Sequence, residues 1–398
     1  MNQYIFILGN NPELSVAEIK ALFPQIEIST KTNIALIGKL VDFDCGEAIK
    51  KLGGTIKIGQ VIDQKIDKEL IIKEITQRAK IHPVKYDNKQ NQDFVNNNPT
   101  EKTADNSEKL FNRVNYGLSF YETKPTKIGM EIKKELKARG LSSRLVVSRE
   151  KVLSSVIVKK NKVTEFLILP SILALTCAVQ EFEAYGKRDY GRPKSDAHSG
   201  MLPPKLARMM INLSGAKNDD LILDPFCGSG TVLTEALALN YKNIIGSDLA
   251  AKACEDSQDN LDWLCGEYHI TDAKYVIYNI GADKLSSKIK PRAVGAIITE
   301  PYLGPTIKED EKESHIFKII SGIENIYLKA FTEFKIVLKT NGLVVIIMPF
   351  WHLGQREFKL RIENKIANLG FKRLDRGNLI YSRPDQKVWR QIEIWQNK

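Results

Sequence analysis

An α/β fold with a mainly parallel sheet is predicted for the C-terminal half of this chain. Five apolar segments have the length of buried strands, and helical segments separate most of them. They cover residues 221–225, 243–248, 275–280, 294–299 and 343–349. Strands that alternate with helices pair in parallel and bind ligands at their carboxyl ends. Two terminal segments, Leu379–Ser382 and Arg390–Trp395, are expected to pair in antiparallel fashion and to complete a seven-stranded sheet.

The first of these strands runs into the sequence Asp-Pro-Phe-Cys-Gly-Ser-Gly-Thr at Asp224–Thr231, and a helix follows. Gly228 and Gly230 lack a Cβ atom, so the backbone can turn sharply there and approach a ligand closely. The helix N-terminus offers free N–H groups to an anionic group such as a carboxylate. The second strand ends at Asp248, where an acid can accept both hydroxyls of a ribose. Together these features predict a site for a nucleoside ligand.

Polar residues also follow the third and fourth strands. Asp283 can accept from the exocyclic amine of an adenine, although an aspartate after a strand is also a common turn residue or helix cap. The fourth strand ends in Thr299–Tyr302 (Thr-Glu-Pro-Tyr), which puts hydrogen-bond acceptors and a flat ring at the same edge of the sheet. Ordinary turn chemistry gives similar sequences, and the position beside the nucleoside site favours a functional interpretation.

The 398 residues are enough for two or three domains, and the first of them is predicted at residues 1–62. Tyr4–Leu8 has the pattern of a strand and Leu14–Phe23 that of an amphipathic helix. Ile34–Leu40 and Ile56–Ile62 then predict two more strands. We expect a small α+β domain without catalytic residues.

A polar, Asn-rich segment at 85–109 is predicted to be a mobile insertion. After it, Arg113–Tyr121 is expected to be a strand and Ile128–Arg139 a helix that Gly140 caps. Arg144–Val147 and Val152–Val158 are predicted to be further strands. The apolar stretch Phe166–Val179 contains Pro170, is too short to span a bilayer, and is expected to form a strand and a helix between domains.

The formal charge of +11 and the pI near 9.2 favour a polyanionic partner, although a lysine-rich surface can also serve solubility alone. The basic residues of the predicted helix and of the segment after it could hold phosphates, or could form an ordinary solvated face. They are Lys133, Lys134, Lys137, Arg139, Lys159 and Lys160. The cysteines form no Cys-x-x-Cys pair, so no metal site is predicted. The N-terminus has no basic leader, and we expect a cytoplasmic protein.

The motifs at Asp224–Thr231, Gly246–Asp248, Ala282–Asp283 and Thr299–Tyr302 resemble those of the S-adenosylmethionine-dependent amino-methyltransferases. Two further stretches, 187–206 and 381–384, are similar to the THUMP-containing tRNA guanosine-N2 methyltransferases, which modify the tenth nucleotide. The resemblance covers nearly the whole chain.

This resemblance implies a class I methyltransferase domain with a Rossmann-like, seven-stranded sheet at residues 196–398. It also implies a ferredoxin-like domain at 1–62, a THUMP RNA-binding domain at 63–165 and a linker at 166–195. The expected cofactor is S-adenosylmethionine, and the expected partner is tRNA. Arg188 and Arg192 join the basic residues above as expected RNA contacts. A small activating subunit is compatible with the sequence but not required by it.

The resemblance also assigns roles to single residues. Asp224, Phe226, Gly228 and Gly230 are expected to surround the methionine half of the cofactor. Asp248 is expected to hold its ribose and Asp283 its adenine. The target guanine is expected to meet the catalytic segment Thr299, Glu300, Pro301 and Tyr302.

One departure from the family affects these expectations. The fourth motif is usually Asp- or Asn-Pro-Pro followed by Tyr or Phe, whereas this chain has Thr-Glu-Pro-Tyr at Thr299–Tyr302. Either Glu300 supplies the missing acceptor from the next position, or the activity or the target differs. The leading hypothesis is methyl transfer to the N2 amine of a tRNA guanosine. The alternatives are an amine in rRNA or DNA, and a non-catalytic RNA-binding protein that keeps the cofactor fold.

Overall fold

The computed structural model describes residues 2–81, 113–195, 201–305, 307–308, 310–353, 355–382 and 388–398. The insertion predicted at 85–109 lies outside the described residues. The chain forms two compact units, one containing residues 6–56 and 180–398 and the other residues 2–5 and 57–179. The boundary falls within β1 (Asn2–Leu8) and within β4 (Thr55–Asp63).

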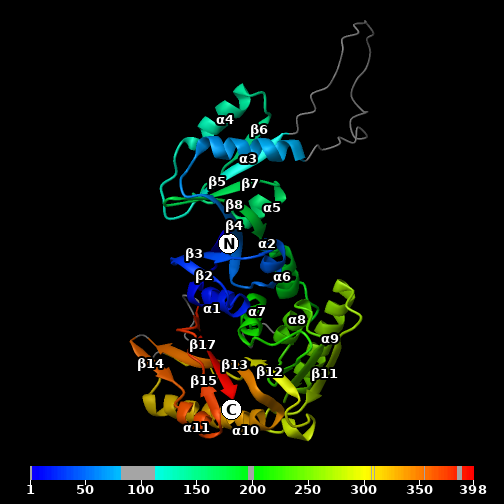
Figure 1. The fold of residues 1–398 in the computed structure, drawn as a ribbon. Helices are drawn as coiled ribbons and strands as arrows, with labels where there is room; N and C mark the ends of the chain where they lie inside the picture. The colour runs from blue at the N-terminus through cyan, green and yellow to red at the C-terminus, as the bar shows by residue number, and fades with distance from the viewer. Residues whose placement is uncertain are drawn as a thin grey trace. The chain divides into compact units, whose positions relative to one another are not determined.

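The larger unit contains a sheet whose main path has seven strands (Figure 1). In order across the sheet they are β11 (Lys274–Asn279), β10 (Asn243–Asp248), β9 (Leu221–Asp224), β12 (Val294–Thr299), β13 (Leu338–Leu353), β17 (Val388–Asn397) and β15 (Phe371–Arg373). The first five pair in parallel, and β17 is antiparallel to both of its neighbours. The chain order reverses between β9 and β12, where open α/β sheets bind their ligands.

The five predicted parallel strands are confirmed, as is the antiparallel pair of β16 (Ile380–Tyr381) with β17. The expected number of strands needs correction. β14 (Arg356–Lys359), which pairs with β13, and β15 were not anticipated, and they bring the sheet to nine strands. These two strands are short and mostly polar, so they lack the apolar periodicity that reveals a strand.

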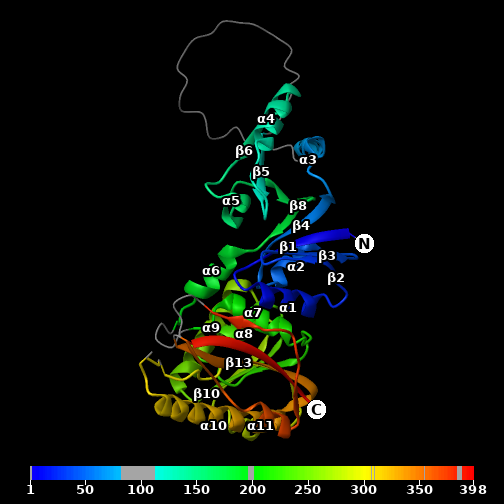
Figure 2. The same cartoon turned by 90° about the vertical axis from the view of Figure 1, so that its left-hand side faces the viewer.

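Helices cover both faces of this sheet (Figure 2). Alternate strand residues point to opposite faces, so Ile222 packs against α7 (Pro204–Leu213), α8 (Thr231–Ala238) and α9 (Ala251–Tyr268), whereas Leu223 packs against α10 (Glu313–Val337). α11 (Glu363–Asn368) lies on the α10 side. α6 (Phe182–Tyr190) precedes α7, and a short 3-10 turn, η1 (Leu285–Ser287), follows β11.

The N-terminal part of the same unit packs onto α7. α1 (Pro12–Leu22) contributes Leu14 and Ala17 to the core on the α7 side. β2 (Glu27–Lys31) pairs in antiparallel fashion with β3 (Ala35–Leu40), and α2 (Cys45–Lys51) follows. The prediction of α1, β1, β3 and β4 is confirmed, whereas β2 and α2 were not anticipated.

Glu18 of α1 joins this part to α7 through a fully buried carboxylate. It accepts from the backbone N–H groups of Gly53 and Gly54 at 2.7 and 2.8 Å, and from Asn212 Nδ2 at 2.6 Å. Burial raises the pKa of this carboxyl to about 7, while the three hydrogen bonds and Arg208 act in the opposite direction. Three donors therefore converge on one buried carboxyl group.

Replacing Glu18 with glutamine is expected to lower the free energy of unfolding by about 1–3 kcal/mol, because the new NH₂ group faces donors and leaves at least one of them unpaired. Urea unfolding at pH 8, where the native carboxyl is ionised, measures the loss. Glu13→Gln on the same helix is the control. Glu13 is exposed and pairs with Lys31, so its replacement is expected to change stability by less than about 0.5 kcal/mol. Equal effects of the two variants would contradict the assignment.

The smaller unit has a second sheet in the order β4, β8 (Ile172–Val179), β7 (Thr164–Leu169), β5 (Val114–Phe120) and β6 (Ser143–Val146). α3 (Lys68–Ile81) and α4 (Ile128–Ala138) pack on its core, and Gly140 ends α4 with a positive φ of 75° as expected.

Two predictions in this unit are wrong. Val152–Val158 is not a strand, because the Ser154 side chain accepts from Ile157 N and starts the helix α5 (Ser155–Lys160). Phe166–Val179 forms the antiparallel strands β7 and β8 rather than a strand and a helix. Ser171, with a φ of 59°, lies in the tight turn between them.

Within the described residues, no helix combines the length and the apolar character that crossing a bilayer requires.

Candidate active site

The residues predicted at the strand ends meet at one edge of the large sheet. β9 ends at Asp224, β10 at Asp248 and β12 at Thr299, and β9 lies between the other two strands in the sheet. Strand pairing thus brings together three residues that are far apart in the sequence, as the parallel arrangement predicts.

Asp224 is the most enclosed of these acids, with 2% of its surface exposed. Its Oδ1 accepts from Thr299 Oγ1 at 2.6 Å and from Phe226 N at 3.2 Å. Burial raises the pKa of Asp224 to about 7, the charges of Asp248 and Glu300 act in the same direction, and the two hydrogen bonds oppose them. A carboxyl in this condition ionises readily when a cation is placed beside it.

The glycine turn is tied to the end of β10. Gly228 N donates to Asp248 Oδ2 at 3.0 Å, and Ala250 N donates to Oδ1 at 2.9 Å. A carboxylate has about four lone-pair positions, so Asp248 can still accept from two hydroxyl groups. Gly228 and Gly230 both have positive φ, at 50° and 82°.

The two glycines differ in what surrounds them. A Cβ atom on Gly230 would lie 2.5 Å from Ser257 Oγ, whereas a Cβ atom on Gly228 would meet no protein atom within 4 Å. The open space beside Gly228 would let a ligand approach the backbone closely. Its N–H group is at the same time held by Asp248.

Gly230→Ala is expected to destabilise the fold by at least about 1–2 kcal/mol, because the left-handed backbone disfavours a side chain and the Cβ atom also collides with Ser257. Gly228→Ala shares only the backbone cost, and is expected to melt closer to the wild type but to bind the cofactor less well. Thermal melting and calorimetric titration with S-adenosylmethionine separate the two effects. A Gly228→Ala variant with wild-type cofactor affinity would contradict this view of the turn.

Asp283, the residue expected beside the adenine, is exposed after the end of β11. A Cβ atom on Gly281 would lie 2.5 Å from Asp283 Oδ1 and 3.7 Å from Leu249 Cδ1, so a carboxylate and an apolar side chain flank this glycine. Leu249 is 81% exposed. Asn279 Nδ2 donates to the carbonyl oxygens of Asp248 and Leu249 at 3.0 and 2.9 Å and orients the turn. Sequence reasoning missed Leu249 and Asn279, although both adjoin strand ends that it had identified.

The segment after β12 divides into an enclosed part and an open part. Thr299 is fully buried, and its hydroxyl is engaged by Asp224. Glu300 Oε1 accepts from Arg390 Nε at 2.5 Å, and the Glu300 side chain is 14% exposed. Burial raises the pKa of Glu300, whereas the charge and hydrogen bond of Arg390 lower it. Pro301 is buried and Tyr302 is 55% exposed.

Sequence reasoning did not anticipate Arg390. It lies on β17, ninety residues after its partner. Its only signal is a cation within the terminal strand Val388–Asn397, in which five of the ten residues are apolar.

The residues present fit S-adenosylmethionine. The cofactor carries a sulfonium, an ammonium and a carboxylate at one end, and a ribose and an adenine at the other. Asp224 offers a buried negative charge, and Gly228 offers room beside the backbone. Asp248 keeps acceptor capacity for hydroxyls, while Leu249 and Asp283 offer an apolar surface and an acceptor for a base.

Two of the expected RNA contacts have a different place in the structure. Arg188 is 4% exposed and pairs with Glu235 Oε1 at 2.5 Å, and Arg192 is 5% exposed and donates to Thr231 Oγ1 at 2.7 Å. Both therefore hold α8, the helix after the glycine turn, from inside the protein. Both guanidinium groups are buried, which is not compatible with a contact to an RNA phosphate at the surface, so this part of the expectation is corrected.

The other basic residues lie on α4 and α5 of the smaller unit. Lys133, Lys134 and Lys137 are exposed on α4. Arg139, at the end of the same helix, pairs with Glu69 and Glu135 at 2.7 and 3.0 Å, which neutralises part of its charge. Lys159 and Lys160 are exposed at the end of α5.

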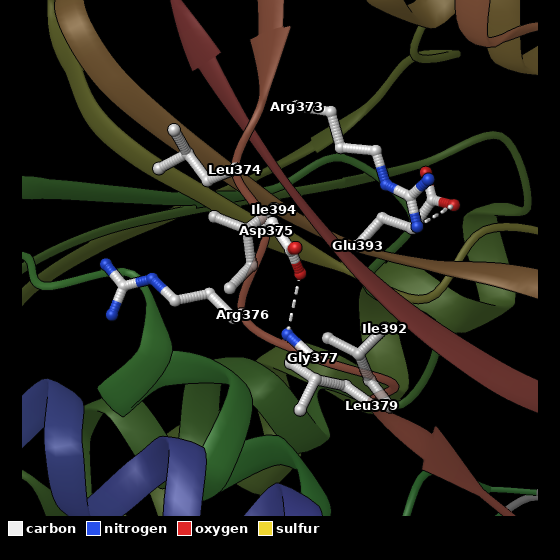
Figure 3. A pocket seen from close by; sticks show the side chains of 9 residues that line it. All are labelled: Arg373, Leu374, Asp375, Arg376, Gly377, Leu379, Ile392, Glu393 and Ile394. Atoms are coloured by element: carbon white, nitrogen blue, oxygen red, sulfur yellow. Dashed lines mark hydrogen bonds and ion pairs between the residues drawn. The ribbon is translucent and has the colours of Figure 1, made fainter.

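A cavity of about 320 Å³ lies along β17 and the segment that links β15 to β16 (Figure 3). Arg373, Asp375, Arg376 and Glu393 line it, and Asp375 Oδ1 accepts from Gly377 N. Its lining contains none of the site residues predicted from the sequence, so this cavity does not belong to the site at the strand ends.

The chain is similar to several known proteins. A family model described as an RMKL-like methyltransferase domain matches residues 192–350, and one described as DNA methylase matches residues 51–259. A tRNA (guanine(10)-N2)-dimethyltransferase from Methanothermobacter thermautotrophicus is 38% identical over 107 residues, which is 27% of this chain and 29% of the relative. One of the same name from Methanocaldococcus jannaschii is 31% identical over 155 residues, 38% of this chain and 39% of the relative. The chain thus matches less than two fifths of the length of these curated relatives.

The crystal structure of TrmN from Thermus thermophilus aligns over the full length of both chains with a TM-score of 0.51 and 13% identity, which supports the fold. The strand order, the methyltransferase match and the fit of the strand-end residues agree on a class I methyltransferase that uses S-adenosylmethionine. The DNA methylase model covers more than half of the chain, and the protein belongs to that family of methylases.

Proposed function

We propose that this protein transfers a methyl group from S-adenosylmethionine to the N2 amine of a guanosine in tRNA, at position 10. The observation that carries the proposal is the carboxylate of Glu300, held by Arg390 at the end of β12 and within the electrostatic influence of Asp224. The two archaeal relatives described above are named for this reaction and this nucleotide, which supports the choice of target.

The reaction needs a positioned amine and little else. When bound, the cofactor supplies a sulfonium methyl group, so that the N2–C bond forms as the S–C bond breaks and S-adenosylhomocysteine is left. Guanine N2 is a weak nucleophile because its lone pair is delocalised into the ring. Glu300 accepts a hydrogen of the amine, which turns the lone pair towards the methyl group, and then takes the proton that N2 loses. Tyr302, more than half exposed, offers a ring on which the extruded base can stack.

A carboxylate at this position favours guanine over other bases. Guanine carries its N1–H and N2–H donors side by side, and both can point at the two lone pairs of one carboxylate oxygen. Adenine carries a lone pair on N1 next to its amine, which would face the lone pairs of Glu300. The replacement of the usual Asp- or Asn-Pro-Pro by Thr-Glu-Pro at Thr299–Pro301 therefore keeps the acceptor and moves it by one residue.

RNA binding is proposed for the smaller unit. The exposed lysines of α4 and α5 and the overall charge of +11 are suited to phosphates. In this proposal residues 1–62 form a ferredoxin-like domain, 63–165 a THUMP domain, 166–195 a linker and 196–398 the methyltransferase domain. The chemistry requires no activating subunit, and tRNA as the substrate implies a cytoplasmic location.

The test is incubation of the purified protein with an unmodified tRNA transcript and methyl-labelled S-adenosylmethionine, followed by digestion to nucleosides. Label is expected in N2-methylguanosine or N2,N2-dimethylguanosine, and its loss is expected when position 10 is changed from guanosine to adenosine. Label found only in adenosine or cytidine would contradict the proposal. Cofactor binding without transfer to any RNA would favour a non-catalytic RNA-binding protein.

A second candidate is methylation of an amine in DNA, which the description of the matching family favours. The strand-end arrangement also suits adenine N6 or cytosine N4 as acceptor. Competition of equal concentrations of tRNA, rRNA and duplex DNA for the labelled methyl group separates the candidates, because we expect label in tRNA alone.

A further inference from the structure

Arg390 is a buried cation that belongs to none of the sequence motifs at the strand ends. Only 6% of its surface is exposed, and its Nε lies 2.5 Å from Glu300 Oε1. A guanidinium taken out of water needs an anionic partner in fixed geometry, and a buried carboxylate needs a cation. β17 pairs with β13 through nine consecutive residue pairs, including Pro349 with Arg390. The backbone that carries Arg390 is therefore rigid, and Glu300 is held from the sheet itself.

The neighbouring Thr299 has a different task. Its fully buried hydroxyl donates to Asp224 Oδ1 at 2.6 Å, so it locks the acid of the cofactor side rather than facing a substrate. Glu300 gives only Oε1 to Arg390, and among the described residues no group donates to its Oε2. One carboxylate oxygen is thus anchored, and the other is left for a donor that the described part of the chain does not supply.

We propose that Arg390 is a positioning residue that holds Glu300 through Oε1 and leaves Oε2 to accept the target amine. The proposal rests on the amine methylation proposed above and adds to it a residue from the last strand of the sheet. It assigns the first two positions of the altered motif separate tasks: Thr299 fixes the cofactor-side acid, and Glu300 meets the base.

The charges around Glu300 predict how the pH dependence of kcat changes when Arg390 is removed. Arg390 on β17 is the cation that opposes the effect of burial, while Asp224 on β9 and Tyr327 on α10 are the other titratable groups within its electrostatic influence. Without Arg390, burial and the charge of Asp224 both favour the protonated carboxyl. The pKa of Glu300 then rises, and the acid limb of the kcat profile moves to higher pH.

The experiment compares Arg390→Met, Arg390→Lys and Arg373→Met with the wild type. Arg373 is the matched control, because it also forms an ion pair with a carboxylate of β17, Glu393, at 3.3 Å but lies on the edge strand β15. We expect Arg390→Met to lower kcat by about 10²-fold with the cofactor Kd changed less than about twofold, and Arg390→Lys to recover to within about tenfold of the wild type. Arg373→Met is expected to keep the wild-type kcat and pH profile. Thermal melting identifies any variant that fails to fold.

Two further measurements separate positioning from mere stabilisation. If Arg390 acts through Glu300, the double variant Arg390→Met/Glu300→Gln is no slower than Glu300→Gln alone. Independently of any substrate, ¹³C NMR of carboxyl-labelled glutamate, with Glu300→Gln for assignment, is expected to show a higher Glu300 pKa in Arg390→Met. An unchanged pKa, or additive losses in the double variant, overturns the proposal. If the wild type methylates no guanosine, the proposed function fails, whereas the NMR titration still decides the role of Arg390.

Discussion

Glu300→Gln is expected to lower kcat for guanosine methylation by about 10²–10³-fold while the protein folds normally. Glutamine has the size of glutamate, but it carries one acceptor and an NH₂ donor. If the glutamine oxygen accepts from Arg390, the glutamine NH₂ group faces the N–H donors of guanine. If the amide is turned by 180°, its NH₂ group faces the N–H donors of the guanidinium instead. The loss of one preorganised hydrogen-bonding group, such as a donor of an oxyanion hole, lowers kcat by about 10²–10³-fold in other enzymes. The base can also no longer transfer the N2 proton to a carboxylate.

Single-turnover rates with saturating tRNA and cofactor measure this effect. Calorimetry is expected to find cofactor affinity within about threefold of the wild type, because Glu300 is proposed to face the substrate and not the cofactor. Glu313→Gln is the control. Glu313 begins α10 in the segment after the motif, is 59% exposed and is 3.8 Å from Arg356, so its charge matters little. A Glu300→Gln enzyme with half of the wild-type kcat would show that the acceptor lies elsewhere, for instance on a backbone carbonyl.

The sequence was sufficient for the part of the site in which each residue sits at the end of its own strand. Asp224 and Asp248 follow apolar runs, so their position at the carboxyl edge follows from strand-helix alternation alone. The positive φ of Gly228 and Gly230 could also be predicted locally, because glycine adopts this conformation without steric cost. Motif spacing therefore predicted where these residues lie, at the carboxyl ends of their strands, and their contact with the cofactor stays a prediction.

Contacts between distant strands could not be predicted in this way. The pairing of Arg390 with Glu300 depends on β17 entering the sheet antiparallel beside β13, and on its register. The bond between Thr299 and Asp224 depends on β9 and β12 being neighbours. A single sequence carries no record of register, so such pairs become visible only in the folded chain.

Charge in the sequence was also a poor guide to exposure. Arg188 and Arg192 look like RNA contacts in a basic stretch, yet Glu235 and Thr231, about forty residues later, enclose both of them. Local propensity failed where a capping residue or a turn decided the outcome. Ser154 turned an apolar run into the helix α5, and the turn at Ser171 folded another into two strands.

Asp224→Asn is expected to weaken S-adenosylmethionine binding by about 10- to 100-fold at pH 8 and to remove a pH dependence that the wild type shows. Burial raises the pKa of Asp224 to about 7 in the free protein, so the carboxyl is mostly protonated at pH 6 and mostly ionised at pH 8. A bound cation favours the ionised form. Binding must therefore release a proton at low pH, and wild-type affinity is expected to be about tenfold lower at pH 6 than at pH 8.

Calorimetric titrations from pH 6 to 8, in buffers of different ionisation enthalpy, give both the affinity and the protons released. The difference between wild type and Asp224→Asn removes the titration of the cofactor itself. Asp220→Asn is the matched control: this acid precedes β9, and the hydrogen bonds from Lys217 N and Lys339 keep its pKa low, so it stays ionised throughout the range. If wild type and Asp224→Asn show the same pH dependence, the proton comes from another group and Asp224 does not face the charged end of the cofactor. If the dependence disappears only in Asp224→Asn, the acid that Thr299 locks in place is the one that senses the cofactor's charge.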